Sequence, residues 1–134
     1  MNTGEIVTAT IRVAASPEEV FPYLVDPSLM VQWIGTRADL DPVPGGIFAL
    51  HFESTSARGT YVSVEPPKRV VFTWGIPENE ALPPGASTVE ILLSADGDET
   101  IVELFHYDLP TELRTSHREG WEEYLEALRT AAPS

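Results

Sequence analysis

The sequence predicts an α+β fold in which a curved antiparallel seven-stranded sheet wraps around a long C-terminal helix. Three observations lead to this prediction. Apolar and polar residues alternate with a period of two in seven segments, which indicates half-buried strands. Two helix-start signals lie close together near the N-terminus, and one long amphipathic segment closes the chain. A sheet that curls around a single helix buries the apolar faces of both, so this is the arrangement we expect.

The first expected strand covers Glu5 to Val13, in which every second residue is apolar. Ser16 and Pro17 then combine a helix N-cap with proline at the first helical position, and Glu19 completes a capping box. Pro22 is expected to end or bend this helix early, because its ring removes a hydrogen bond and crowds the preceding turn.

A second short helix is predicted after Asp26, whose carboxylate can cap the backbone amides that follow. Pro27 again stands at the first helical position, and apolar residues at helical spacing continue as far as Trp33 and Ile34. Gly35 is expected to end this helix. The sequence therefore places two short helices between strands one and two.

Six further strands are expected, separated by turn residues at the spacing of an antiparallel meander. Their predicted ranges are Arg37 to Asp41, Gly46 to Ser54, Ala57 to Glu65, Arg69 to Trp74, Ser87 to Ala95 and Glu99 to Asp108. Asp96-Gly97-Asp98 is typical of a tight hairpin. The connection Gly75 to Ala86 is longer than most loops in compact domains, and loops of that length are often lids or partner surfaces; the alternative is an inert crossover.

The segment from Thr111 to Ala131 is expected to form the long helix. Its apolar face is formed by residues at helical spacing, while glutamates occupy the opposite face. The residues on this face are His117, Trp121, Tyr124, Leu125 and Leu128. Because the chain has no internal repeat and no linker-like stretch, we expect residues 1–134 to form one domain.

Composition excludes several classes of function. The chain has 134 residues, a formal net charge of −13 and no cysteine. The charge disfavours nucleic acid and anionic membrane surfaces as partners, because both bind through lysine and arginine. The lack of cysteine excludes disulfides and thiolate chemistry. No apolar run reaches about 18 residues and the N-terminal residues lack a secretory pattern, so we expect a cytoplasmic protein.

A series of short motifs runs along the whole chain. They are Ser16-Pro17-Glu18, Val20, Asp26-Pro27, Trp33, Gly45-Gly46, Phe48, Gly59-Thr60-Tyr61, Pro66-Pro67, Arg69, Phe72-Thr73-Trp74, Ser87-Thr88-Val89, His106, Leu109-Pro110 and Gly120-Trp121. Their order resembles the START-like superfamily of helix-grip folds, and within it the family related to the activator of Hsp90 ATPase. The resemblance implies a helix-grip fold. It leaves three functions open, because one fold hosts many activities.

The first of these functions is binding of a small, mainly hydrophobic molecule between the sheet and the C-terminal helix. The second is a co-chaperone-like module that acts on a chaperone or another protein, and the third is an enzyme similar to polyketide cyclases and aromatases. The sequence departs from the family pattern at Pro22, at Val43, where a basic residue is common, and at Ile76, where an aromatic residue often stands. The last two imply an apolar rim with fewer contacts to anions.

We expect the ligand site on the concave face of the sheet and the facing side of the helix. Its predicted residues are Trp33, Phe48, Leu50, Phe52, Phe72, Trp74, Val89, Ile91, Val102, Leu104, His106, Trp121, Tyr124 and Leu125. The same residues would equally form a packed core. An empty cavity of about 300 Å³ would cost roughly 7 kcal/mol, so a hollow there would need water or a ligand to fill it.

Few polar groups are available to orient a ligand on this face, namely His106, Tyr124, Trp121 and Tyr61. An imidazole at a pocket mouth can donate or accept a hydrogen bond near neutral pH. The alternative for His106 is a structural bond to the backbone at the end of the last strand. Substitution by glutamine separates the two roles, because loss of binding alone supports the first and equal loss of stability supports the second.

No catalytic residue, metal ligand or cofactor is expected. His51 and His106 fall on strands that the predicted sheet order places four strands apart, about 19 Å at the usual spacing. His117 has no second histidine at ligand spacing. The sequence also has no Gly-x-Ser-x-Gly motif and no acidic residue on the inner face of the central strands.

The outer face of the predicted sheet carries more apolar residues than solvent exposure explains. These residues are Ile47, Ala49, Leu92, Phe105 and Tyr107. A contiguous exposed apolar patch usually marks an interface, so we expect a homodimer formed through this face. The alternative is that twisted strand ends turn these residues inward.

Overall fold

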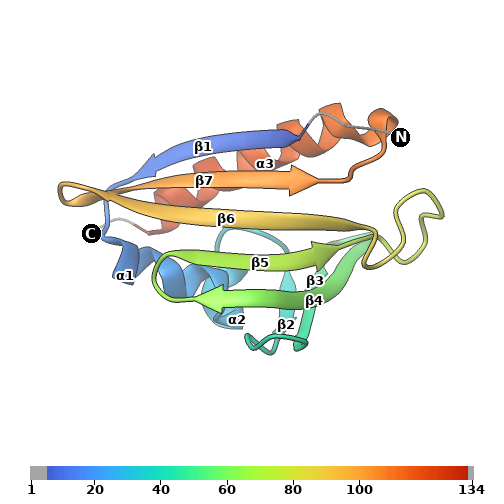
Figure 1. Ribbon diagram of the computed structural model, residues 1–134, viewed down its shortest axis with the longest axis horizontal. Coiled ribbons are helices and arrows are strands. Elements are labelled where there is room, and N and C mark those ends of the chain that lie inside the picture. The colour runs from blue at the N-terminus through green and yellow to red at the C-terminus, as the bar shows by residue number, and fades with distance from the viewer. Residues whose placement is uncertain (1–5, 133–134) are drawn as a thin grey trace.

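The computed structural model describes residues 6–132 and confirms the α+β helix-grip fold. A seven-stranded antiparallel sheet has the order β1-β7-β6-β5-β4-β3-β2 (Figure 1). The elements are β1 Val7–Val13, α1 Pro17–Val20, η1 Phe21–Leu24, α2 Pro27–Met30, β2 Arg37–Leu40, β3 Ile47–His51, β4 Ser56–Glu65, β5 Arg69–Trp74, β6 Ser87–Asp96, β7 Glu99–Tyr107 and α3 Thr111–Ala131. Glu5, which was expected to begin the first strand, lies outside the described residues.

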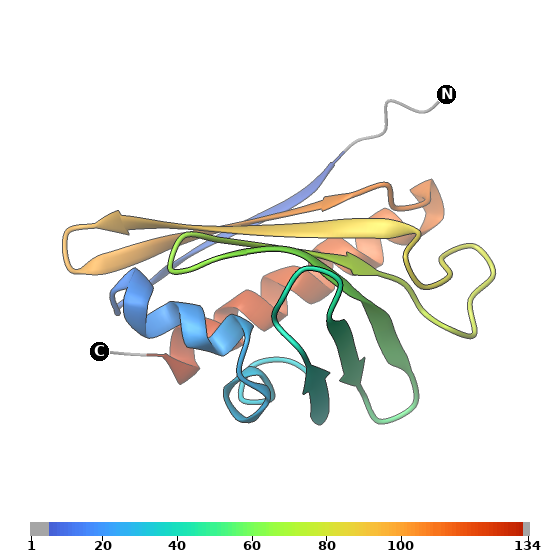
Figure 2. The same cartoon turned by 60° about the horizontal axis from the view of Figure 1, so that its bottom comes forward.

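The long helix α3 crosses the concave side of the sheet (Figure 2). It buries Trp121, Leu125 and Leu128 against the strands, as its amphipathic pattern predicts. Strand β7 shows the matching alternation, with Val102, Leu104 and other inward residues buried and the residues between them half-buried. Within residues 6–132, no helix is long and apolar enough to cross a membrane.

The two short helices begin where the capping signals place them. The Ser16 hydroxyl accepts the Glu19 N–H at 3.2 Å, and the Glu19 carboxylate accepts the Ser16 N–H at 2.9 Å. Pro22 ends the first helix as expected, because α1 stops at Val20 and the chain continues as the 3₁₀ helix η1. The second helix is shorter than predicted, since α2 ends at Met30 and turns carry the chain to Gly35.

One strand boundary differs in a way that shapes the site. The predicted strand Gly46 to Ser54 ends at His51, so Phe52 lies in a turn. The Phe52 N–H donates to the Thr55 carbonyl at 2.8 Å, and this hydrogen bond closes a tight turn between β3 and β4. Phe52 is therefore half-buried at the edge of the sheet, where its ring faces Tyr124 of α3.

The centre of the concave face is solidly packed. Phe48 and Phe72 stack with ring centroids 3.8 Å apart, and Tyr61 meets both rings edge-on. The gaps that remain among Met30, Trp33, Phe48, Phe72, Trp121 and their neighbours are too small for a water molecule. Among residues 6–132, this central face has no cavity of the size expected, which agrees with the high cost of keeping a dry void.

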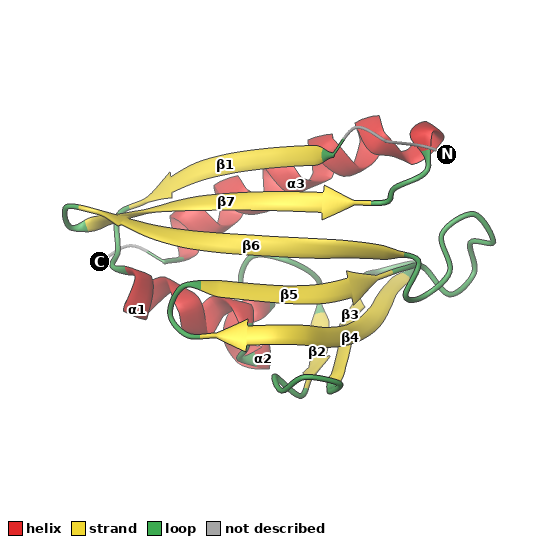
Figure 3. Ribbon diagram, in the orientation of Figure 1, coloured by secondary structure: helices red, strands yellow, loops and turns green. Residues whose placement is uncertain are grey.

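The connection between β5 and β6 protrudes beyond the end of the sheet (Figure 3). Leu82 anchors it, because its side chain is completely buried and its carbonyl accepts the Ile76 N–H at 2.7 Å. A pocket beside α3, described in the next section, is lined by no residue of this loop (75–86). The structure therefore gives this loop no lid position over that pocket.

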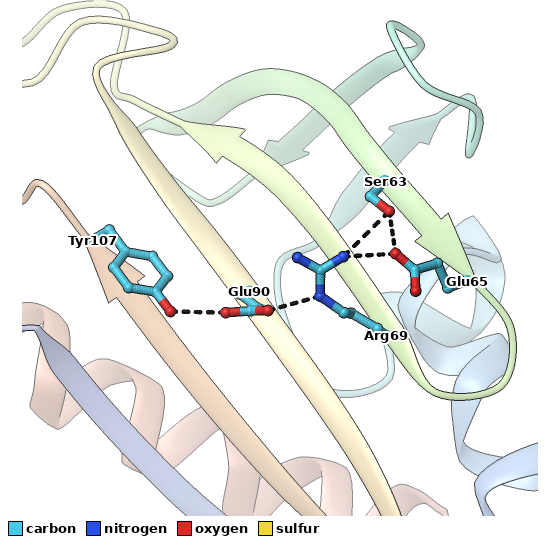
Figure 4. Close-up of polar contacts among 5 residues, drawn as sticks. All are labelled: Ser63, Glu65, Arg69, Glu90 and Tyr107. Atoms are coloured by element: carbon cyan, nitrogen blue, oxygen red, sulfur yellow. Dashed lines mark hydrogen bonds and ion pairs between the residues drawn. The ribbon is translucent and has the colours of Figure 1, made fainter.

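The outer face of the sheet is more polar than expected. Arg69 donates to Glu90 at 2.7 Å and to Glu65 at 2.6 Å, and Glu90 also accepts the Tyr107 hydroxyl at 2.8 Å (Figure 4). The expectation that Ala49 is exposed is wrong, because only 1% of its surface is accessible. Its small side chain lies between longer ones on the neighbouring strands.

Candidate functional site

A pocket of about 320 Å³ opens to solvent between the N-terminal half of α3, the end of β5 and the turn after β3. We call it the aromatic pocket, because four of its residues are aromatic. Its lining consists of Phe52, Thr55, Trp74, Ser116, His117, Gly120, Trp121 and Tyr124. It lies between sheet and C-terminal helix, at the end of the hollow and not at its packed centre.

The walls of the aromatic pocket are two pairs of rings. Trp74 is the last residue of β5 and lies 5.1 Å from Trp121 of α3, measured between ring centroids, with the ring planes at 54°. Phe52 and Tyr124 lie 6.2 Å apart at 33°. Such tilted arrangements suit the quadrupoles of aromatic rings, which hold the walls in place without a ligand.

A chain of hydrogen bonds fixes Trp121 and His106 behind the pocket. The Trp121 Nε1–H donates to Nδ1 of His106 at 3.0 Å, so this nitrogen is an acceptor and the ring proton resides on Nε2. That Nε2–H faces the Ser87 hydroxyl at 2.9 Å, and the Ser87 O–H donates to the Trp74 carbonyl at 2.8 Å. Every polar atom of the buried His106 ring is therefore occupied.

His117 accepts a hydrogen bond from Trp74, as His106 does from Trp121. The Trp74 Nε1–H donates to Nε2 of His117 at 3.3 Å, and Nδ1 of His117 donates to the Leu113 carbonyl at 3.1 Å. Burial lowers the pKa of His117, and burial together with the nearby His117 lowers the pKa of His106 to about 3. Both imidazoles are neutral at physiological pH, and their hydrogen bonds determine which nitrogen of each ring carries the proton.

The structure divides the predicted site residues into two groups. Phe52, Trp74, Trp121 and Tyr124 line the aromatic pocket. The others lie in the packed interior, namely Trp33, Phe48, Leu50, Phe72, Val89, Ile91, Val102, Leu104, His106 and Leu125. Of the polar groups proposed to orient a ligand, Tyr61 is also in the interior, where its hydroxyl donates to the Leu24 carbonyl at 3.2 Å.

Four lining residues did not appear among the predicted site residues: Thr55, Ser116, His117 and Gly120. A usable signal existed for three of them. His117 and Trp121 are four residues apart, as are Ser116 and Gly120, so these residues share one helix face. Thr55 had no such signal, because its position depends on the turn that follows β3.

Gly120 is unusual because neither packing nor backbone conformation requires it. A Cβ atom added there would find no neighbour nearer than 3.9 Å, where it would meet the Tyr124 ring. Glycine inside a helix costs about 1 kcal/mol relative to alanine. Its effect at this position is to keep the floor of the aromatic pocket clear.

Metal ligation finds no support in the part of the chain that the structure describes. Across residues 6–132, the histidine, aspartate and glutamate side chains form no group of three that could hold a metal ion. His51 instead lies 3.1 Å from Asp39 at the far edge of the sheet. Strands β3 and β7, which carry His51 and His106, are separated by three other strands.

The sequence is similar to those of a known protein family. A family model described as "Activator of Hsp90 ATPase homolog 1-like protein" matches residues 14–132. The chain belongs to this family. No curated protein matches the sequence. An AHSA1-like protein of Rhizobium etli shares 36% identity, with 96% of this chain and 82% of that chain covered and a TM-score of 0.72.

Two further solved structures share the fold at lower identity. The Aha1 dimer of Colwellia psychrerythraea shows 18% identity and a TM-score of 0.85, with 96% of each chain covered. DynU16, described as a putative protein in the dynemicin biosynthetic locus, shows 19% identity and a TM-score of 0.82 over 95% of this chain. The present chain spans 46% of the length of DynU16. These two likenesses show that the fold is shared.

Proposed function

We propose that this protein binds a small, mainly hydrophobic molecule in the aromatic pocket. The observation that carries the proposal is an open pocket of about 320 Å³ walled by four aromatic rings, with the helical Gly120 in its lining. This volume is at the lower end of the range of ligand sites, and such sites are usually apolar with a few polar groups. A ligand with one or two rings fits this description.

The polar atoms able to contact this ligand are hydroxyl groups. The indole N–H groups of Trp74 and Trp121 already donate to His117 and His106. The hydroxyls of Thr55, Ser116 and Tyr124 also lie at the lining, and that of Ser116 donates to the Leu113 carbonyl at 3.2 Å. The pocket therefore recognises its ligand mainly by shape and ring contacts, with hydroxyl groups setting its orientation.

The proposal is tested by native mass spectrometry of the protein purified from its own host. We expect a retained small molecule on the wild type and none on Gly120→Leu, whose side chain would fill the pocket. Thr115→Leu is the matched control, because Thr115 lies on the same helix, is exposed and does not line the pocket. Equal retention by all three proteins would contradict binding at this site.

A second candidate function is an interaction with a chaperone, and the family description favours it. Such a module acts through its surface and needs no occupied pocket. The test is whether the wild-type protein changes the ATPase rate of the Hsp90 of its host. A change that Gly120→Leu leaves intact supports this function, whereas no change at saturating protein argues against it.

A cyclase-like or aromatase-like reaction is the third candidate, and the biosynthetic locus named for DynU16 favours it. Holding a reactive chain in one shape inside the aromatic pocket would be the main contribution of the protein. Turnover of a small polyketide that Gly120→Leu abolishes supports this candidate. Tight binding of the same compound without turnover supports a carrier instead.

Association of two copies through the outer face of the sheet is a further part of the proposal. Its support is the exposure of Ile47 and Val62 on neighbouring strands, at 48% and 50%, and the dimer of the Colwellia relative. Light scattering at high micromolar concentration should give the mass of a dimer, and Ile47→Glu should give that of a monomer. A wild-type monomer would contradict this association.

A further inference from the structure

The aromatic pocket offers an anion no formal positive charge. Its lining contains neither lysine nor arginine. The strong donors near it are engaged, because the N–H groups of Trp74 and Trp121 point at histidine nitrogens. His117 is neutral, since one of its nitrogens accepts from Trp74 and the other donates to the Leu113 carbonyl. A carboxylate placed here would lose hydration without gaining a cation.

The helix side of the pocket rim is acidic. Glu112 lies four residues before Ser116, Glu119 lies three residues after it, and Glu123 lies three residues after Gly120. Residues three or four apart are neighbours on a helix surface, so each of these glutamates adjoins a lining residue. All three are exposed. Their carboxylates are therefore free to face a group at the pocket mouth.

This negative charge reaches the pocket itself. Burial and then the Glu123 carboxylate raise the pKa of the Tyr124 hydroxyl. On the opposite wall, the exposed Glu53 directly follows Phe52. The acidic character thus extends over both sides of the opening and agrees with the formal net charge of −13.

The two arginines in this half of α3 do not offset the glutamates at the mouth. Arg114 donates its Nε–H to the Leu109 carbonyl at 3.2 Å, which holds it at the connection between β7 and α3. Arg118 is three residues before Trp121 and adjoins that lining residue, but at 100° per residue it lies about 140° around the helix from Glu123.

Building on the proposed function, we propose that the ligand of the aromatic pocket is an amphipathic cation, with an apolar ring system inside and an ammonium group at the acidic rim. Aromatic faces attract a cation lying over them, and the carboxylates attract it further. The same arrangement discriminates against apolar carboxylates such as fatty acids. This assignment goes beyond hydrophobic binding, which by itself would not distinguish ligands of different charge.

The test uses three probes with one ring system and different charge at neutral pH: 2-naphthylmethylamine, 2-naphthalenemethanol and 2-naphthylacetic acid. Isothermal titration calorimetry at low salt should give about tenfold tighter binding of the amine than of the acid, with the alcohol between them. Raising the salt to about 0.2 M should shrink this difference, because the rim charges are exposed to screening.

The rim residues are tested with Glu119→Gln/Glu123→Gln, and Glu18→Gln, at an exposed glutamate of α1 away from the pocket lining, is the matched control. The double variant should bring the amine and the acid to within about threefold of each other while leaving the affinity of the alcohol unchanged. The control should keep the wild-type preference. Equal binding of amine and acid by the wild type, or a preference that the double variant retains, would overturn the cation assignment.

The failure of this inference is distinguishable from failure of the proposed function. If the alcohol binds the wild type but not Gly120→Leu, the pocket is a hydrophobic site whatever the charge preference. If no probe binds the wild type, the proposed function fails and the charge preference fails with it.

Discussion

At the scale of single residues, His106 shows how burial fixes a role. Its ring is completely buried, one nitrogen accepts from Trp121 and the other faces Ser87. Of the two roles considered for His106, the pocket-mouth role would require contact with a ligand, and this residue does not line the pocket. The structural role follows, although its partners are side chains and not the backbone bond that was expected.

The first prediction concerns substitution of His106. In His106→Phe, the Trp121 N–H and the Ser87 hydroxyl both lose a partner in a dry interior, so we expect the free energy of unfolding to fall by about 3 kcal/mol. Urea unfolding followed by circular dichroism measures this loss. His51→Phe is the control, because His51 is only half-buried at the edge of the sheet, and it should cost less. An unchanged stability in His106→Phe would contradict the network.

A pH dependence follows from the same residue. Burial lowers the pKa of His106 to about 3 in the folded protein, while the unfolded chain binds a proton near pH 6.5. The unfolded state therefore gains protons first as pH falls, and stability is lost on acidification. Between about pH 6 and 5, before most carboxylates titrate, the free energy of unfolding should fall by about 1.4 kcal/mol per pH unit. His106→Gln should show a shallower slope in urea unfolding, and an identical slope would exclude His106 as the cause.

At the scale of elements, α3 both stabilises the fold and leaves space for the pocket. Its buried face stabilises the fold, whereas Gly120 weakens the helix and leaves room beside Tyr124. At the centre of the sheet, the stacked rings of Phe48 and Phe72 fill the available space. The pocket lies beside this filled centre, between α3, the end of β5 and the turn after β3.

We predict opposite effects of Gly120→Ala on stability and on binding. Alanine should raise the free energy of unfolding by about 0.5–1 kcal/mol, because it restores helix propensity and its Cβ atom meets only ordinary contacts. The added methyl group should weaken binding of the naphthyl alcohol. Thermal unfolding and calorimetry on the same samples provide the two measurements, and Thr115→Ala is the control that should leave binding unchanged. A simultaneous rise in stability and affinity would contradict the role given to Gly120.

At the scale of the whole molecule, the concave side of the sheet has two regions. Its packed centre stabilises the fold, and the aromatic pocket at its end is the proposed binding site. The packed centre contains Ile91, which is 1% exposed, whereas Phe52 is half-buried at the pocket wall. Ile91→Ala should cost about 2–5 kcal/mol of unfolding free energy and preserve probe binding at temperatures where it remains folded. Phe52→Ala should cost less stability and abolish most binding.

Chemical denaturation and calorimetry on both variants test this division. The comparison is matched, because each variant truncates a large apolar side chain to alanine on the same side of the sheet. If Ile91→Ala lost binding while folded and Phe52→Ala retained it, the site would lie at the centre and the aromatic pocket would not be the ligand site.

The sequence by itself determined the elements and their order. Ser16 and Asp26 mark their helices because capping is a local interaction, and the alternation along β7 records which of its faces meets the core. The family motifs, spread over the whole chain, agree with the helix-grip fold. Local interactions such as capping, and the period with which residues are buried, can be predicted from the sequence alone.

Only the tertiary structure decided where the hollow is filled and where it is open. Phe48 and Phe52 belong to the same alternating pattern, yet one is sealed in the core and the other walls a pocket, because a turn after His51 moves Phe52 out of the strand. The hydrogen-bond partners of His106 and His117 also depend on residues up to 43 positions away. A pattern gives the face on which a side chain lies, but the space left in front of it depends on side chains contributed by distant parts of the chain.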